Sequence, residues 1–205
     1  MTILLERAWD ILVQNRRAYI AFNALYYGLM LVFMVYVNFN PALHESILKQ
    51  YNGAFMIGPL AVNPPEGLEL LKSAAKTFLL NVLGSSYTEI SLPSFILPFS
   101  GIAISLYRAA VQGIFFSPSD PSIARIFIPH LPTLLLEGQA AVLAMLGAYV
   151  HGRGLIWPET IGQQSRWRAY IEGVRQSGTL YMLVMPILLI SAIYGIIETA
   201  ALVVR

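Results

Sequence analysis

Residues 126–150, IFIPHLPTLLLEGQAAVLAMLGAYV, decide the fold class of this chain. The run is long enough to cross roughly 30 Å of hydrocarbon at about 1.5 Å per helical residue, so it predicts a membrane-crossing helix. Within it stand a histidine and a carboxylate, His130 and Glu137. They are nearly two helical turns apart, which places both on one face of the predicted helix, and that face is expected to avoid lipid.

The composition shows the same membrane character over the whole chain. Of 205 residues, 57% are hydrophobic and 12% are charged, and the mean hydropathy is +0.63, which is too apolar for an ordinary soluble domain. We therefore expect an all-α fold, a polytopic membrane helix bundle in the cell membrane with the lipid bilayer as a partner. The net charge of +2 comes without a basic stripe, so no nucleic acid partner is expected. The chain has no cysteine, which excludes a cysteine-type metal site. No cofactor is expected.

The pattern of charges and prolines divides one predicted membrane domain, 1–205, into about five crossings. The expected segments are an amphipathic, interfacial lead-in helix at 1–17, a first crossing at 18–37, an extracytoplasmic loop at 38–72, two short or broken crossings within 74–117, a fourth crossing at 126–150, a cytoplasmic loop at 151–178 and a fifth crossing at 180–204. A short surface helix is expected at 43–51. Arginines gather at the N-terminus and in the predicted cytoplasmic loop, so the positive-inside rule favours a cytoplasmic N-terminus.

The segment 74–117 allows two interpretations. Pro93 and Pro98 predict breaks in a helix, so the first is a pair of short crossings in which the chain reverses between Glu89 and Gly101. The second is a re-entrant hairpin, which requires protein or water to satisfy its exposed backbone groups.

Polar side chains within the predicted crossings are the candidates for function. They are Asn81, Glu89, Arg108, His130, Glu137 and Glu198. A charged carboxylate at the bilayer centre costs about 2.5–3.5 kcal/mol, so Glu137 and Glu198 are expected to face protein or water. Asn81 and Arg108 are among their candidate partners, and Arg108 is also a candidate to pair with Glu89. His130 follows Pro129, where we interpret it as a cap at the mouth of the crossing rather than as a metal ligand.

Small residues recur at every fourth position on the last two predicted crossings. They are Ala140, Ala144, Ala148 and Gly152 on the fourth crossing, and Ser191, Gly195 and Thr199 on the fifth. Ridges of this kind let two helix backbones approach closely. We expect the ridges to mediate helix packing and a homodimer, with Glu137 and Glu198 beside the packed surfaces.

The fourth and fifth predicted crossings carry short motifs that resemble a known family. They are Phe127-Ile-Pro-His130, a following glutamate, and a small-residue helix with Gly147 and Gly152; further likenesses are Arg7-Ala-Trp9, Asn81 early in the second crossing, and Ile197-Glu198. Together they resemble the stage II sporulation protein M family, which are multi-pass membrane proteins of bacteria and archaea. The chain departs from the family pattern at Leu131 and Leu134, where a glycine and a glutamate are usual.

The resemblance implies a non-enzymatic scaffold or assembly subunit that associates with other membrane or cell-envelope proteins. No enzyme activity is expected, since the sequence lacks the His-Glu-x-x-His, Gly-x-Ser-x-Gly and phosphate-loop signatures. The alternative is a small-solute or ion transporter or channel whose path is lined by the polar candidates. The first hypothesis predicts dry, packed carboxylates, and the second predicts a cavity that reaches Glu137.

Overall fold

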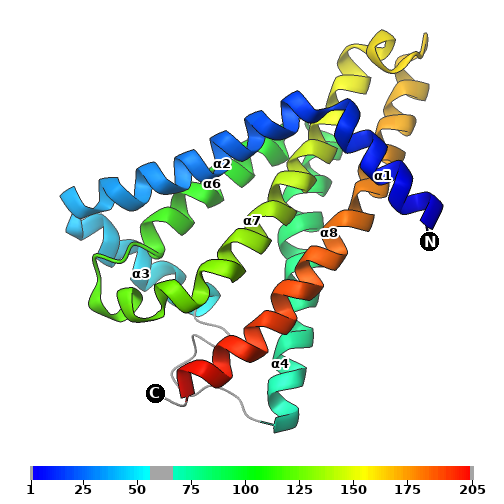
Figure 1. Cartoon of the computed structure of the whole chain (residues 1–205). Helices are drawn as coiled ribbons and strands as arrows, with labels where there is room; N and C mark the ends of the chain where they lie inside the picture. Colours follow the sequence, from blue (N-terminus) through cyan, green and yellow to red (C-terminus); the bar gives the residue numbers. More distant parts are fainter. Residues whose placement is uncertain (1, 56–66, 204–205) are drawn as a thin grey trace.

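The computed structural model describes residues 2–55 and 67–203, and all regular structure in these ranges is helical (Figure 1). The elements in chain order are α1 (Thr2–Gln14), α2 (Arg16–Tyr36), the 3-10 helix η1 (Val37–Phe39), α3 (Pro41–Phe55), α4 (Gly67–Leu79), the π-helix η3 (Leu80–Ser91), α5 (Leu92–Ile96), α6 (Ser100–Phe115), α7 (Pro121–Ile156), the 3-10 helix η4 (Pro158–Ile161) and α8 (Arg166–Val203). The predicted all-α class is confirmed for the described residues.

Three helices are long and apolar enough to cross a membrane. They are Arg16–Phe39, Ile123–Ile156 and Arg166–Glu198, and they overlap the predicted first, fourth and fifth crossings. By the length and composition of these helices, the chain is an α-helical membrane protein. Between the first two of them, α4, the π-helix and α5 form one continuous helical segment, followed by α6. With 16 residues, α6 is shorter than the roughly 20 residues of an ordinary crossing.

Prolines interrupt the helices less than the sequence predicted. The chain reverses at 97–99, inside the expected interval. The predicted break at Pro93 is wrong, because the π-helix continues directly into α5 and carries this proline inside the helical segment. Pro129 and Pro132 lie inside α7, and Pro186 lies inside α8. In membrane helices, neighbouring helices and polar side chains can satisfy the backbone groups that such prolines leave free.

Two predicted loops are largely helical. Because α7 continues to Ile156 and α8 begins at Arg166, the prediction of a loop over 151–178 is wrong for most of its length. The polar residues of 151–178 show where the apolar spans of α7 and α8 end, but the helices themselves continue beyond those spans. The helix ends before Pro158, since a proline disfavours helical backbone in the preceding residue. In the first predicted loop, α3 is longer than the expected 43–51, α4 begins at Gly67, and 56–66 lie outside the described residues.

The most extensive contact between helices joins α7 and α8, which form a long hairpin (Figure 1). The α7 ridge of Ala140, Ala144 and Ala148 is fully buried within one chain. Close approach of the two backbones is seen at Gly147, where a Cβ atom would collide with the hydroxyl of Ser177. The α7 ridge is therefore used for packing inside the molecule, and the expected homodimer stays a prediction.

The remaining small residues have other surroundings. Gly152 packs against the ring of Phe99, whereas a Cβ atom at Gly195 would meet no heavy atom within 4 Å. Ser191 is buried. Thr199 lies in α8, but its side chain is outside the described part of the structure.

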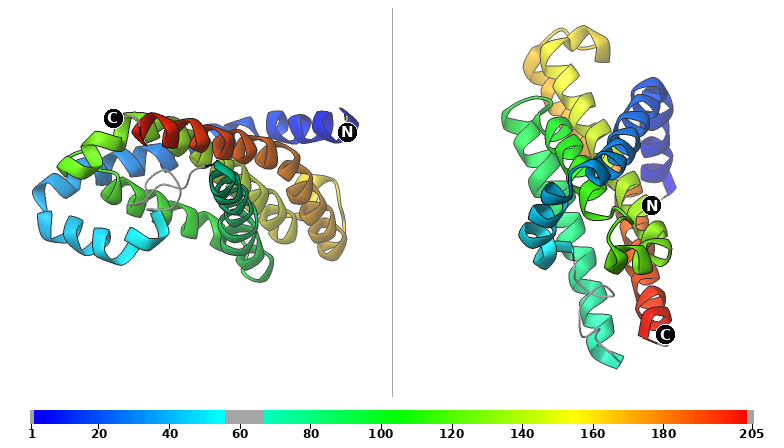
Figure 2. Two further views of the ribbon diagram at one scale, coloured as in Figure 1. Left: turned by 90° about the horizontal axis from the view of Figure 1, so that it is seen from below. Right: turned by 90° about the vertical axis from the view of Figure 1, so that its left-hand side faces the viewer.

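The helix ends gather at two opposite ends of the bundle (Figures 1 and 2). At one end, the Ser117 hydroxyl donates a hydrogen bond of 3.0 Å to the carbonyl of Met34, which joins the end of α6 to the end of α2. At the other end, the Tyr170 hydroxyl donates to the carbonyl of Phe95 at 2.9 Å, which joins the beginning of α8 to α5. Helices that cross one bilayer require this arrangement.

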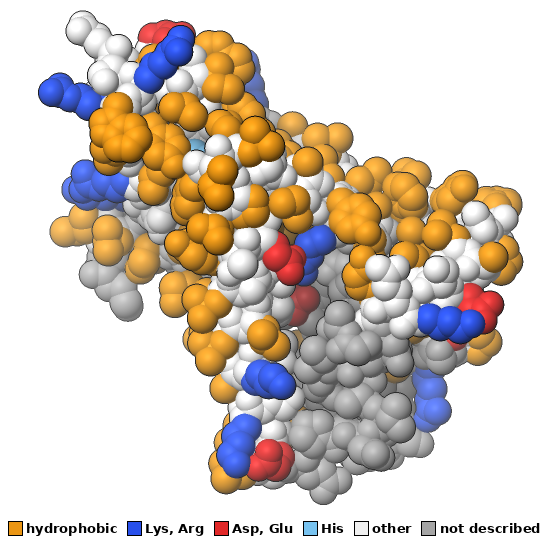
Figure 3. All heavy atoms as spheres, turned by 180° about the vertical axis from the view of Figure 1, so that it is seen from behind, with side chains coloured by type: hydrophobic (Ala, Val, Ile, Leu, Met, Phe, Trp, Pro, Cys, Tyr) orange, Lys and Arg blue, Asp and Glu red, His pale blue; other side chains and the backbone are white. Residues whose placement is uncertain are grey.

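Hydrophobic side chains cover much of the outer surface (Figure 3). In α1, Ala8 is buried while Trp9 and Val13 are exposed, and the helix packs along α8. An exposed apolar face on such a helix suits the interfacial position that the sequence predicts. On the face shown in Figure 3, a few acidic and basic side chains lie at the hollow in the middle of this apolar surface.

Candidate functional site

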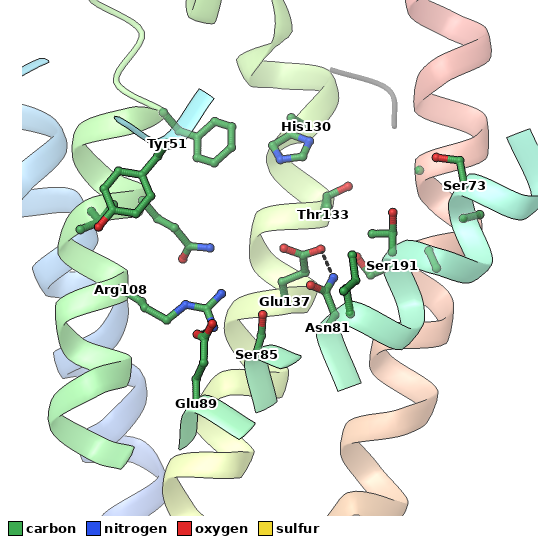
Figure 4. A pocket seen from close by; sticks show the side chains of 18 of the residues that line it. Tyr51, Ser73, Asn81, Ser85, Glu89, Arg108, His130, Thr133, Glu137 and Ser191 are labelled. Carbon is green, nitrogen blue, oxygen red and sulfur yellow. Dashed lines mark hydrogen bonds and ion pairs between the residues drawn. The ribbon is translucent and has the colours of Figure 1, made fainter. Parts of the chain in front are cut away.

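A cavity of about 410 Å³ lies among α4, the π-helix, α6, α7 and α8, with Tyr51 of α3 also in its lining (Figure 4). Its volume falls within the range of roughly 300–1,000 Å³ that is typical of small-molecule sites. Polar side chains from all five helices line it: Ser73, Thr77, Asn81, Ser85, Glu89, Tyr107, Arg108, Gln112, His130, Thr133, Glu137 and Ser191. Five of the six predicted functional residues are in this set, and Glu198 lies directly behind it.

The π-helix supplies three of the polar lining side chains, Asn81, Ser85 and Glu89. A π-helix closes hydrogen bonds between residues five apart and so has a wider turn than an α-helix. Residues spaced by four therefore remain on one side of it, and here that side faces the cavity. Ser86 and Ile90 of the same element are buried. π-helical turns are rare and are frequent at functional sites.

Glu137 and Asn81 form the central contact of the cavity (Figure 4). The Asn81 side-chain amide donates a hydrogen bond of 2.6 Å to Glu137 Oε1, although the two residues are 56 positions apart in the chain. Among the described residues, Asn81 is the hydrogen-bond partner that the structure gives to this carboxylate. Glu137 also lies near the middle of the apolar span Ile123–Ile156. The site thus holds a carboxylate, bonded to one amide, at mid-membrane depth.

Arg108 of α6 pairs with Glu89 of the π-helix, as the sequence suggested. The guanidinium Nη1 lies 2.5 Å from Glu89 Oε2. The two side chains are 28% and 50% exposed, so the pair is partly solvated and contributes about 1 kcal/mol or less to stability. Its main consequence is electrostatic, because the positive charge of Arg108 is already neutralised by a partner.

His130 and Glu198 form a buried pair between α7 and α8. His130 Nδ1 lies 2.8 Å from Glu198 Oε1, and the Thr133 hydroxyl donates to Glu198 Oε2 at 3.0 Å. The ring of Phe116 stacks on the imidazole with 4.8 Å between ring centroids. The prediction that His130 caps the mouth of a crossing is wrong, because α7 begins at Pro121 and carries His130 inside the helix. Both oxygens of Glu198 are occupied, so this carboxylate is dry and packed.

A second polar network, which the sequence analysis missed, joins α2 to α7. The Tyr19 hydroxyl donates to Gln139 Oε1 at 2.7 Å, and Gln139 Nε2 donates to Asn23 Oδ1 at 2.6 Å. Most of the candidates predicted from the sequence are ionisable residues, and the amides of Asn23 and Gln139 are not among them. A pair of amides, Asn23 and Gln139, in two long apolar runs was the signal that predicts such a contact, since an unpaired amide in lipid is costly.

Ser191 supplies a further polar group at the cavity. This residue is 2% exposed, and its Oγ atom has no hydrogen-bond partner within the part of the chain that the structure describes. A buried hydroxyl without a partner costs about 1–3 kcal/mol. Because Ser191 lines the cavity, a solute or a water molecule there can supply the missing partner. The described residues hold no cluster of three or more His, Cys, Asp or Glu side chains that would suit a metal ion.

The fold and the site together define an α-helical membrane protein with a polar cavity inside its helix bundle. Comparison with models of known protein families, with curated proteins and with solved structures finds no match. The function is therefore inferred from the cavity and the residues that line it.

Proposed function

We propose that the chain is a membrane transport protein that binds a small polar solute in the cavity and passes it across the bilayer. The observation that carries this proposal is the open space of about 410 Å³ beside Glu137. Protein interiors are normally close-packed. In a helix bundle with a purely structural role, we would therefore expect side chains to fill this space. A polar cavity around a carboxylate near the middle of a membrane span is typical of a solute or ion pathway.

The two buried carboxylates differ in a way that bears on the competing hypothesis. A scaffold or assembly subunit, as implied by the resemblance to the stage II sporulation protein M family, needs only packed carboxylates at its helix contacts. Glu198 fits that description, since it is 1% exposed and both of its oxygens are bonded. Glu137 lines the cavity instead. The scaffold hypothesis thus accounts for one carboxylate, and transport accounts for the other.

The proposal includes five crossings and a cytoplasmic N-terminus in the cell membrane. Beyond the three long helices, the remaining crossings are the continuous segment from α4 to α5, and α6. Large apolar side chains on the first of these face outward, where lipid would surround them: Leu79, Leu83, Leu92 and Ile96. Five of its polar residues line the cavity: Ser73, Thr77, Asn81, Ser85 and Glu89. This division of sides supports a membrane position for the segment.

Uptake into liposomes tests the transport proposal. We would compare three permanently charged or neutral probes of similar size: methylguanidinium, methylurea and methanesulfonate. We expect at least one probe to enter protein-containing liposomes faster than protein-free liposomes, and the Glu137→Gln variant to lose most of this uptake. The Glu45→Gln variant, which removes an exposed carboxylate on α3, serves as the control and should retain it. Uptake that equals that of protein-free liposomes for all three probes, or that is unaffected by Glu137→Gln, would overturn the proposal.

A further inference from the structure

The balance of charge around the cavity indicates which class of solute it binds. Among the described lining residues, the charged groups are Arg108, Glu89 and Glu137, with His130 already bonded to Glu198 behind them. Arg108 is paired with Glu89 at 2.5 Å. Glu137 has a neutral amide as its hydrogen-bond partner. Within the described part of the chain, the cavity therefore contains one carboxylate, Glu137, that has no cationic partner of its own.

An anionic solute would be poorly matched to this arrangement. It would have to displace Glu89 from Arg108, and it would then share the cavity with two carboxylates. Like charges that are brought together in a site of low dielectric repel strongly. A cationic solute is well matched to the cavity, because it can pair with Glu137 while the ion pair between Arg108 and Glu89 stays intact. Figure 4 shows the Arg108 guanidinium beside Glu89, across the cavity from Glu137.

Hydrogen-bond acceptors near Glu137 favour a cation that carries N–H groups. The Asn81 side-chain N–H donates a hydrogen bond to Glu137 Oε1. The carbonyl oxygen of the same Asn81 side chain is then the acceptor that a solute can use. The Ser191 hydroxyl is buried and has no partner in the described part of the chain. The rings of Tyr107 and Phe116 also border the cavity, and aromatic faces attract organic cations.

We propose that the cavity binds a small organic cation with N–H donors, such as an alkylammonium or guanidinium compound, through the carboxylate of Glu137. This inference rests on the proposed function, since it assigns the solute of the same site. The solute pairs with Glu137 and donates further hydrogen bonds to the Asn81 carbonyl and the Ser191 hydroxyl. A cation of this kind supplies both the missing countercharge and the missing donors.

Binding can be measured separately from transport by isothermal titration calorimetry of the protein in lipid nanodiscs. Methylguanidinium is the probe, methylurea is its neutral isostere, and methanesulfonate is the anionic comparison. We expect methylguanidinium to bind at least about tenfold more tightly than either of the others, because a charge-assisted contact in a desolvated site is worth more than a neutral one. Glu137→Gln should weaken its binding by about thirtyfold or more, while Glu45→Gln should leave it unchanged.

Fold and assembly are checked by the melting temperature and elution volume of each empty variant, so that a misfolded protein is not mistaken for a loss of binding. Equal binding of methylurea, or tighter binding of methanesulfonate, would overturn the inference. So would methylguanidinium binding that persists in a folded Glu137→Gln variant.

The two proposals fail in different ways. If methylguanidinium binds through Glu137 but no probe crosses liposomes, the cation site stands and the transport proposal fails. If methylurea or methanesulfonate crosses in a Glu137-dependent manner and binding shows no preference for the cation, transport stands and the inference on the solute fails.

Discussion

Glu198 and Glu137 show how differently two membrane carboxylates can be accommodated. Glu198 is bonded through both oxygens, to His130 and to Thr133, and is almost completely buried. Glu137 has one amide partner and borders a cavity. The sequence predicted that both would avoid lipid, because the cost of a charge in hydrocarbon depends only on the residue and its depth. It did not predict the His130 partner, which lies 68 positions away on another helix.

At this scale, the first prediction concerns the buried pair. Replacing His130 with alanine leaves the Glu198 carboxylate buried without one of its partners, so we expect the free energy of unfolding to fall by about 3 kcal/mol or more. Thr133→Val, which removes a single neutral hydrogen bond to the same carboxylate, should cost about 1 kcal/mol. Reversible unfolding in mixed micelles, followed by tryptophan fluorescence, measures both. Equal losses for the two variants would contradict the view that the His130 contact dominates.

The elements differ in how far their form could be predicted. α2, α7 and α8 follow from the length of apolar runs, which is a local property of the sequence. The segment from α4 to α5 was harder, because Pro93 predicted a break that did not occur. In addition, nothing in the spacing of Asn81, Ser85 and Glu89 distinguishes an α-helix from a π-helix. That choice depends on packing against α6 and α7, where Ser86 and Ile90 are buried. The cavity was therefore predictable in its residues but not in its shape.

The contact between α2 and α6 gives a prediction at the scale of elements. A Cβ atom at Gly113 of α6 would collide with the backbone of Met30, whereas a Cβ atom at Gly28 of α2 would meet no atom within 4 Å. We expect Gly113→Ala to lower the free energy of unfolding by about 1–3 kcal/mol through overpacking. Gly28→Ala should cause no loss, because alanine is the better helix former. Reversible unfolding in mixed micelles measures the free energy of unfolding of both variants. If the Gly113→Ala protein were as stable as the Gly28→Ala protein, α6 and α2 would not be in this close contact.

The whole molecule places its connections at two ends, and this arrangement was only partly predictable. Counting arginines predicts that the α7–α8 connection lies on the cytoplasmic side, and this side stays a prediction. The joining of distant segments, such as the Ser117 hydroxyl to the Met34 carbonyl, depends on the packed bundle. A short connection around η4 replaces the long loop that polarity suggested, because the helices extend past their apolar spans.

The corresponding prediction is the side of the membrane on which each connection lies. The chain has no cysteine, so single-cysteine variants can be labelled without background. We expect Ser119→Cys, in the exposed connection between α6 and α7, to react with a membrane-impermeant maleimide in intact cells. Glu159→Cys, which is exposed in η4, should react only after permeabilisation. Labelling of both from the same side would mean that α7 does not cross the bilayer.

The position of Glu198 and Ser191 in the chain has a consequence for the order in which the protein is built. Both residues lie in the second half of α8, which leaves the ribosome after every other wall of the cavity has been synthesised. Until then, His130 has no carboxylate to bond and the site lacks one side. During insertion, the cavity thus stays incomplete until the second half of α8 has been added.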